Sequence, residues 1–360
     1  MQIRIISFTE NGERLAEKLS GELAGEKENV ICASARRNSP EYMPLQEWTQ
    51  ENFRQGYALI FIGACGIAVR SIAPFLHSKV TDPAVLVLDE KGQFVIPILS
   101  GHIGEANALA VQVAKITGGE PVLTTATDVN GLFAVDVFAR ENHLLIQDMK
   151  LAREFSASLL RTKKAVLGLP EGMKKTLVLN GNLPEEMDLR YLPEQESMRE
   201  EKCRELSDRM EGAFVLISPE QPRKQILQLI PRCLVLGIGC RKGKSREELE
   251  NFIRLVFQQQ RLSLKAAAQI VSIDLKKEEA GICSLAEEWN IPFKTYTAEE
   301  LNSVSGEFTA SDFVRNRTGV DNVCERAVMA ASAARLLVRK QAENGMTLAI
   351  GIQKEEFHVS

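Results

Sequence analysis

Several features that would place a protein in a class at once are missing from this sequence. No apolar run approaches the roughly 20 residues that cross a bilayer. The seven cysteines are scattered, with no CxxC pair and no zinc-finger spacing. This pattern argues against a disulfide framework or structural zinc and suits a reducing compartment. The first residues read as a strand and an amphipathic helix, not as a signal peptide. We therefore expect a cytoplasmic protein that neither enters nor binds a membrane.

Charge and phosphate-binding fingerprints are also weak. The net charge of -4 gives no general reason to expect nucleic acid or an anionic membrane as a partner. The sequence has neither a Walker A motif nor GxGxxG, which disfavours a nucleotide-binding α/β protein. Histidine is rare, with four in 360 residues, so any histidine at a strand-to-helix junction is notable.

The length and the hydrophobic pattern predict a multi-domain α/β protein. Residues 1–137 alternate strands and helices, which predicts an open, mostly parallel sheet with helices on both faces. Within this domain, "AVLVLD" and "QFVIPIL" flank "EKG" and predict a hairpin. Residues 138–230 are predicted to be a small middle domain, in which "PEEMDLRYLPEQESMREEKCRELSDRM" is a charged surface insertion. Residues 231–360 are predicted to be a second α/β domain.

The C-terminal domain carries two distinct helix signals. Ser245 followed by Glu248 predicts a capping box at the start of one helix. "DNVCERAVMAASAARLL" predicts an Ala-rich helix, with Asp321 as its N-cap.

Four strand-to-helix junctions have the composition of ligand-binding loops. In open parallel sheets ligands lie beyond the carboxyl ends of strands, where small residues let them approach free helix N–H groups. A role in tight turn geometry alone is the alternative for each. The four are Gly63–Gly66, Ser100–Gly104, Thr124–Asp128 and Gly237–Arg241.

His102 is the strongest catalytic candidate. The helix dipole disfavours the protonated imidazole at a helix start, and neutral imidazole can act as a general base. Glu105 and Asn107 lie on the first turns of the same helix. A structural hydrogen bond to the backbone is the alternative role. Asp128 is a candidate acid that could instead cap the next helix.

The densest basic cluster follows Cys240. Arg241, Lys242, Lys244 and Arg246 flank a glycine turn and would suit an anionic ligand. The same cations could lower the pKa of Cys240. A solvated surface is the alternative.

Two further C-terminal motifs contain polar residues near predicted element ends. "SIDLK" places Ser272 and Asp274 at the end of a strand, and "TGVDNVCERA" contains Thr318, Gly319 and Glu325. Capping and turn formation are the alternative roles for these residues.

Six of these stretches, in order, resemble one family. "FIGACGIAVRSIAP", "ILSGHIGEANALA", "TTATDVNGLFAVD", "LGIGCRKG", "SIDLK" and "TGVDNVCERA" are similar to the cobalt-precorrin-5A hydrolase family (CbiG) of anaerobic cobalamin biosynthesis. The resemblance covers residues 55–140 and 233–352. One departure is Glu105, where a second glycine would be expected.

The resemblance implies opening of the δ-lactone of a ring-contracted corrinoid and release of acetaldehyde, giving cobalt-precorrin-5B. Cobalt would belong to the substrate, so neither a cofactor nor a metal-ligand set is expected. We take His102, Ser100, Glu105 and Asp128 as the candidate catalytic residues; Glu105 is included for its place near His102 in the sequence, not for the resemblance. The implied substrate-binding residues are Gly63, Gly66, Gly101, Gly104, Asn107, Thr124, Thr125, Gly237, Gly239, Cys240, Arg241, Lys242, Ser272, Asp274, Thr318, Gly319 and Glu325.

The expected partner is the cobalt-corrinoid substrate; a homodimer and contacts with neighbouring pathway enzymes are left open. The wide, carboxylate-rich macrocycle predicts a cleft between the first and last domains, with loops 100–107 and 237–246 facing one another. The C-terminal segment alone also resembles a small stand-alone protein of the aerobic corrin pathway. A corrinoid-binding carrier, or a partner of a methyltransferase, is therefore the alternative function.

Overall fold

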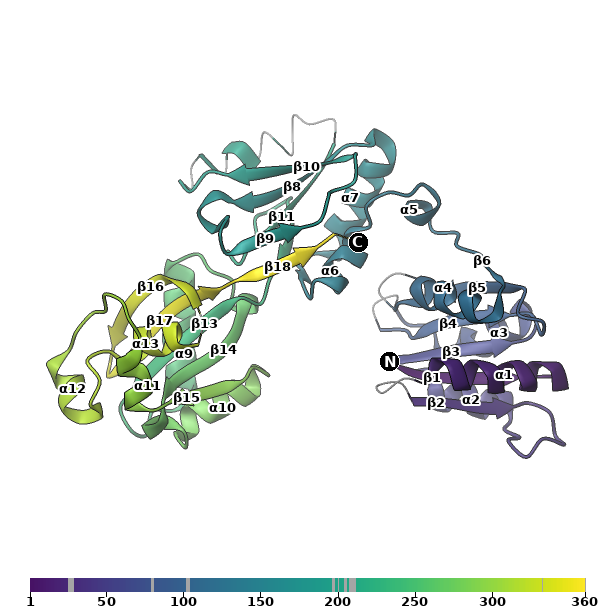
Figure 1. Ribbon diagram of the computed structural model, residues 1–360, viewed down its shortest axis with the longest axis horizontal. Helices are drawn as coiled ribbons and strands as arrows, with labels where there is room; N and C mark the ends of the chain where they lie inside the picture. Colours follow the sequence, from purple (N-terminus) through teal and green to yellow (C-terminus); the bar gives the residue numbers. More distant parts are fainter. Residues whose placement is uncertain are drawn as a thin grey trace. The chain divides into compact units, whose positions relative to one another are not determined.

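A computed structural model describes most of the chain as two compact units, Met1–Val137 and Phe138–Ser360 (Figure 1). The described residues are 1–24, 29–78, 81–101, 104–195, 198–199, 201–203, 206, 212–331 and 333–359; for Thr127, Asp128 and Ala334 only the backbone is described. No helix in these ranges is long and apolar enough to cross a membrane.

The first unit contains a six-stranded sheet of order β2-β1-β3-β4-β5-β6. The first four strands in this order are parallel, β5 is antiparallel to β4, and β6 is parallel to β5. The predicted hairpin and the mostly parallel sheet are confirmed. The strands are β1 (Gln2–Ser7), β2 (Asn29–Ser34), β3 (Tyr57–Ile62), β4 (Ala84–Leu88), β5 (Phe94–Leu99) and β6 (Glu120–Pro121).

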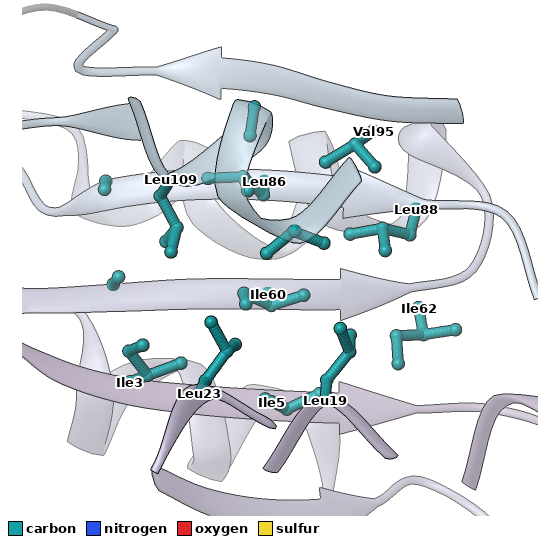
Figure 2. Close-up of a cluster of buried hydrophobic side chains, with 14 of the residues drawn as sticks. Ile3, Ile5, Leu19, Leu23, Ile60, Ile62, Leu86, Leu88, Val95 and Leu109 are labelled. Carbon is teal, nitrogen blue, oxygen red and sulfur yellow. The ribbon is translucent and has the colours of Figure 1, made fainter. Parts of the chain in front are cut away.

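Helices cover both faces of this sheet, as predicted, because successive strand residues point to opposite sides. Leu19 of α1 and Leu109 of α4 pack against Ile60 and its same-face neighbours, as Figure 2 shows. On the other face, Trp48 of α2 and Ile72 of α3 belong to the second core. The helices of this unit are α1 (Glu10–Leu23), α2 (Leu45–Asn52), α3 (Cys65–Ile72), α4 (Ala106–Thr117) and α5 (Ala126–Val129); α6 (Val135–Glu141) crosses into the second unit.

The second unit begins with a five-stranded sheet of order β10-β8-β11-β12-β7. Its β10 lies inside the stretch predicted to be a charged insertion, so that prediction is wrong there. Leu189 of β10 pairs in register with Leu167 of the fully buried β8, and this pairing outweighs the polar composition. The elements are β7 (Leu145–Ile146), α7 (Met149–Thr162), β8 (Ala165–Pro170), β9 (Leu177–Asn180), β10 (Met187–Leu192), β11 (Ala213–Ile217) and β12 (Leu227–Ile230).

The third sheet has the order β15-β14-β13-β17-β16. After it the chain returns to the middle region, where β18 pairs in parallel with β9 (Figure 1). The elements are β13 (Leu234–Cys240), α9 (Arg246–Gln259), β14 (Ala267–Ile273), α10 (Ala280–Glu288), β15 (Phe293–Tyr296), α11 (Ala298–Ser303), α12 (Asp312–Thr318), α13 (Val323–Ala330), β16 (Ala333–Glu343), β17 (Met346–Gln353) and β18 (Glu355–His358).

The two predicted helix signals have different outcomes. The capping box of Ser245 and Glu248 is present at the start of α9. The Ala-rich helix is shorter than predicted, because α13 ends at Ala330 and the chain from Ala333 pairs with β17 instead. Strand pairing here overrides the helix propensity of alanine. Asn322, not Asp321, is the N-cap of α13.

Candidate functional site

Two of the predicted junctions in the first sheet lie at opposite ends of its strands, which we call the two edges of the sheet. Gly63 follows β3 and donates its N–H to Leu88 O at 2.8 Å, at the end of β4. Ser100 follows β5, which runs the opposite way, and its Oγ donates to Asp82 O at 3.0 Å, just before β4. The reversal of β5 therefore places Gly63–Gly66 and Ser100–Gly104 at opposite edges.

The turn between β5 and α4 has an unusual backbone. Ser100 and Glu105 both adopt left-handed conformations, with φ of 55° and 69°. Glycine takes this conformation without the steric cost that a Cβ atom brings. A glycine at 105, which the resemblance led us to expect, would thus suit the observed backbone.

Two N–H groups at the start of α4 are already used. Ala106 N donates to Ser100 O at 3.2 Å, and Asn107 N donates to Gly101 O at 2.9 Å. These two groups are therefore not available to a ligand, contrary to the general expectation for a helix start.

The two glycines of this turn allow close packing. A Cβ atom on Gly101 would lie 2.7 Å from Asn107 Oδ1, and one on Gly104 would lie 2.5 Å from Ser100 Cβ. Both glycines therefore have a structural reason to be there, whether or not a ligand approaches them.

Asn107 joins this turn to the loop after β6. Its Nδ2 donates to Thr125 Oγ1 at 3.0 Å, and the neighbouring Thr124 is exposed. The structure thus brings together Ser100, Glu105, Asn107 and the two threonines at one edge of the sheet. His102 and Ile103, in the middle of this turn, lie outside the described residues.

Asp128 is not a helix cap as one alternative supposed. Its backbone lies inside α5, which begins two residues earlier at Ala126, and its side chain is outside the description.

Asp82 is a buried acid beside this turn that the sequence analysis missed. Its side chain accepts hydrogen bonds from His77 N and Ser78 N, each at 3.1 Å to one of its oxygens. Its own carbonyl accepts from Ser100. Asp82 thus connects a loop that carries a second histidine to the predicted catalytic turn. In the sequence, the only indication of this role is that Asp82 lies just before the apolar residues of the buried strand β4.

The other edge of the first sheet holds Gly63 and Gly66. A Cβ atom on Gly63 would lie 2.7 Å from the Phe8 ring, whereas one on Gly66 would meet nothing within 4 Å. Gly63 is therefore required by packing, and Gly66 is not.

In the third sheet, two cations of the predicted basic cluster are exposed and two are paired. Lys244 Nζ lies 2.6 Å from Glu248 Oε1, and Arg246 Nη1 lies 3.1 Å from Glu250 Oε2. Arg241 and Lys242 are exposed, and neither forms an ion pair within the described parts of the chain. The cluster therefore offers two cations to a ligand instead of four.

Cys240 lies at the same edge, but it is not activated. Burial raises the pKa of its thiol and outweighs the nearby Lys276 ammonium, which acts in the opposite direction. The expectation that cations lower this pKa is wrong, and the thiol is protonated at neutral pH.

Other predicted residues at this edge are committed to the fold. Ser272 is fully buried and donates to Ile238 O at 2.6 Å, joining β14 to β13. A Cβ atom on Gly237 would lie 2.0 Å from Cys324 O of α13, and one on Gly239 would lie 2.5 Å from Thr347 Oγ1. In contrast, Asp274 is exposed just beyond β14.

The residues of "TGVDNVCERA" also have structural roles. Thr318 Oγ1 lies 2.9 Å from Val314 O at the end of α12, where Gly319 supplies the left-handed cap. The Glu325 side chain is fully buried and accepts a hydrogen bond from Lys340 N at 2.8 Å. In this conformation Glu325 cannot touch a substrate directly.

The predicted loops do not line the polar pocket that the second unit contains. One polar pocket of about 640 Å³ lies elsewhere in the second unit and contains none of the predicted site residues; it is lined by Glu194, Arg199, Cys203, Glu220, Gln221, Pro222, Arg223, Lys224, Ile226, Gln259, Gln260 and Arg261. Within the described ranges, no three His, Cys, Asp or Glu side chains are grouped to hold a metal ion.

Comparison with known proteins gives consistent matches along the chain. Family models match as "Cobalamin synthesis G N-terminal" over residues 47–128, "Cobalamin biosynthesis central region" over 133–231 and "Cobalamin synthesis G C-terminus" over 234–351. A cobalt-precorrin-5A hydrolase of Salmonella typhimurium is 35% identical, over 97% of this chain and 97% of its own. One of Priestia megaterium is 28% identical, over 97% and 94%.

A solved structure is also similar. It is a putative cobalamin biosynthesis protein G homolog from Sulfolobus solfataricus, with 23% identity and a TM-score of 0.37 over 98% of this chain and 97% of its own. The family is shown by the three family models, which together match most of the chain, and by the 35% identical relative that covers 97% of it. The chain belongs to the cobalt-precorrin-5A hydrolase (CbiG) family.

Proposed function

We propose that this chain is a cobalt-precorrin-5A hydrolase that acts in anaerobic cobalamin biosynthesis. One water molecule adds to the lactone carbonyl, the acyl–oxygen bond breaks, and a carboxylate and a free hydroxyl form. The hydroxyl then loses its proton as the neighbouring carbon–carbon bond breaks. The electron pair of that bond stays with the macrocycle, which takes up a proton, and the two-carbon fragment leaves as acetaldehyde.

The observation that carries this proposal is the 35% identity to a named hydrolase over nearly the whole of both chains. The match includes each of the predicted loops, because it extends over all three family-model regions. Cobalt belongs to the substrate in this reaction, so the proposal needs no metal site on the protein.

We assign the hydrolytic step to the turn between β5 and α4. His102 is the proposed general base, which would take a proton from the attacking water. Because the N–H groups of Ala106 and Asn107 already have acceptors, the oxyanion needs other donors. The hydroxyl of Thr125 is held beside this turn by Asn107, and the neighbouring Thr124 is exposed; both hydroxyls are proposed for that role.

We assign substrate holding to the carboxyl edge of the third sheet. The substrate carries many acetate and propionate carboxylates. Arg241 and Lys242 are the two exposed cations of the basic cluster that form no ion pair among the described residues. Arginine binds carboxylates in a bidentate geometry, which would fix the orientation of the macrocycle.

The proposal is tested by incubating the purified chain with cobalt-precorrin-5A without oxygen. Acetaldehyde is measured with a coupled NADH-dependent reductase, and the corrinoid is followed by mass spectrometry. We expect acetaldehyde and a corrinoid that has lost the two-carbon fragment in equal amounts, with neither formed by heat-denatured protein. Tight binding of an unchanged substrate would instead identify a carrier.

A further inference from the structure

The segment of residues 304–318, between α11 and α13, lies at the carboxyl edge of the third sheet (Figure 1). It consists of an irregular stretch followed by α12. β16 begins beside Gln353, next to the amino end of β13, and α13 ends just before β16. The first turn of α13 is therefore at the opposite, carboxyl end, where Arg241 also lies.

Glu325 of α13 and Asn322, the N-cap of this helix, are fully buried, and both form hydrogen bonds with Thr309 of this segment. Glu325 accepts hydrogen bonds from Thr309 N and Thr309 Oγ1, both at 2.9 Å. Asn322 donates from Nδ2 to Thr309 O at 2.9 Å while its Oδ1 caps the helix. Burying a carboxylate is costly unless its oxygens are bonded, so Glu325 strongly favours this position of Thr309.

A second pair of residues holds the segment on either side of Thr309. Arg326 donates to Val304 O at 2.9 Å, lies 4.5 Å from the centre of the Phe308 ring, and forms an ion pair with Asp321 at 2.7 Å. Ser311 N donates to Asp321 O at 3.0 Å. The side chains of Asn322, Glu325 and Arg326 thus each contribute to fixing this one segment.

The segment that is held so firmly presents an apolar ring and two cations to solvent. Phe313 of α12 is 63% exposed. The Arg317 guanidinium lies 5.2 Å from the centre of that ring and forms no ion pair in the described parts of the chain. Arg315 is 57% exposed and has only a long contact of 3.4 Å to Asp321.

We infer that the 304–318 segment is a substrate-recognition element, in which Phe313 and Arg317 contact the flat, carboxylate-rich macrocycle and Glu325 is a positioning residue. An exposed aromatic ring can stack on a flat conjugated ligand, and an unpaired guanidinium can bind a carboxylate on its rim. The ring and the guanidinium together match the two features of the corrinoid substrate, its flat conjugated macrocycle and its carboxylates. This inference rests on the proposed function and adds residues outside the Arg241 turn.

The direct contacts are tested with Phe313→Ala and Arg317→Gln in the full chain. Each should raise KM for the corrinoid about tenfold, which is the effect of one lost contact, with kcat within about twofold. Leu255→Ala is the matched control, because Leu255 is 41% exposed on α9 and is expected to leave KM unchanged. Unchanged KM in both test variants would overturn the inference.

The positioning role is tested with Glu325→Gln, which keeps the shape but removes the charge. It should raise KM and also speed tryptic cleavage after Arg315 and Arg317, because the segment is held less firmly. If Glu325 acts through Phe313, a protein with both Glu325→Gln and Phe313→Ala should have nearly the KM of Phe313→Ala alone. If Glu325→Gln does not fold, Thr309→Ala replaces it, since it removes one of the same hydrogen bonds. Full additivity of the two effects would contradict a positioning role.

A binding assay separates this inference from the proposed function. The probe is cobyrinic acid, a cobalt corrinoid with free carboxylates, followed by its absorbance change. If the parent binds it but releases no acetaldehyde from cobalt-precorrin-5A, the proposed function fails, while weaker binding by Phe313→Ala still supports the recognition element. If the parent and both contact variants bind it equally, the recognition element is wrong.

Discussion

At the scale of single residues, the charged groups around the third sheet are of two kinds. Some form hydrogen bonds or ion pairs with other parts of the protein, and others are exposed to solvent. Glu325 and Arg326 fix a loop, and Lys244 pairs with Glu248. Arg241 and Lys242 do neither. Charge density in the sequence predicted a binding role for this cluster, but the sequence alone does not reveal which of its charges have partners.

Charge removal at the exposed pair should weaken substrate binding. We expect Arg241→Gln combined with Lys242→Gln to raise the Kd for the corrinoid by about fivefold and to flatten its dependence on salt, because two screened attractions are lost. Titration at two salt concentrations measures both effects. Lys244→Gln is the control, and an equal loss in that variant would show that the effect is one of general charge.

His102→Ala should keep the fold and lower kcat by a factor of about 10² or more, the usual contribution of a general base. Added imidazole should restore part of the activity, which a purely structural role would not predict. His143→Ala, an exposed histidine in the second unit, serves as the control. Acetaldehyde release at the parent rate by a folded His102→Ala protein would exclude His102 as the base.

At the scale of elements, the direction of one strand decides what the first sheet can bring together. The "EKG" turn was enough to predict that β4 and β5 form a hairpin. Its consequence, that Ser100 and Gly63 belong to opposite edges, needs the pairing order of the whole sheet. In the same way alanine content predicted α13, but the helix ends at Ala330 because the chain from Ala333 forms β16, which pairs with the next strand, β17.

Close packing of α13 on β13 predicts a large effect at Gly237. A Cβ atom there would lie 2.0 Å from a backbone oxygen, so Gly237→Ala should lower the free energy of unfolding by about 2–3 kcal/mol. Gly21→Ala is the control: Gly21 lies within α1 with nothing near its Cβ position, and alanine should add up to about 1 kcal/mol there. Urea unfolding measures both, and similar values for the two variants would contradict the packing argument.

Acid should loosen the first turn of α13. The hydrogen bond from Arg326, and then Arg315, hold the pKa of Asp321 below its usual value of 3.8. A carboxylate with a lowered pKa contributes stability that is present above its unfolded pKa and is lost as the pH falls through the folded one. Unfolding free energy should therefore fall more steeply below about pH 4 in the parent than in Asp321→Asn. Parallel pH profiles would show that this ion pair does not contribute.

At the scale of the whole molecule, the described residues form three large sheets and a two-stranded sheet of β18 and β9, within two compact units. The first unit has a core on each face of its sheet, and in the second unit the last strand, β18, returns to pair with β9. Alternating hydrophobic runs predicted the sheets, whereas the return of β18 involves a partner that is far away in sequence. The proposed base lies in one unit and the proposed carboxylate-binding cations in the other.

This division predicts that neither unit acts alone. Separately expressed residues 1–137 should fold, bind corrinoid poorly and release no acetaldehyde, whereas residues 138–360 should retain binding without turnover. Circular dichroism confirms folding, and the absorbance assay and the coupled assay measure the rest. Full activity from residues 1–137 would contradict the assignment of substrate holding to the third sheet.

The most direct test of the account is a single turnover of cobalt-precorrin-5A in ¹⁸O-labelled water. If water attacks the lactone carbonyl, each product molecule should carry one ¹⁸O in the newly freed carboxylate, and one acetaldehyde should appear for each product. The carboxylate label is read by fragment mass spectrometry after the protein is removed. Acetaldehyde release with no label in that carboxylate, or substrate that stays intact on the protein, would contradict a lactone hydrolase.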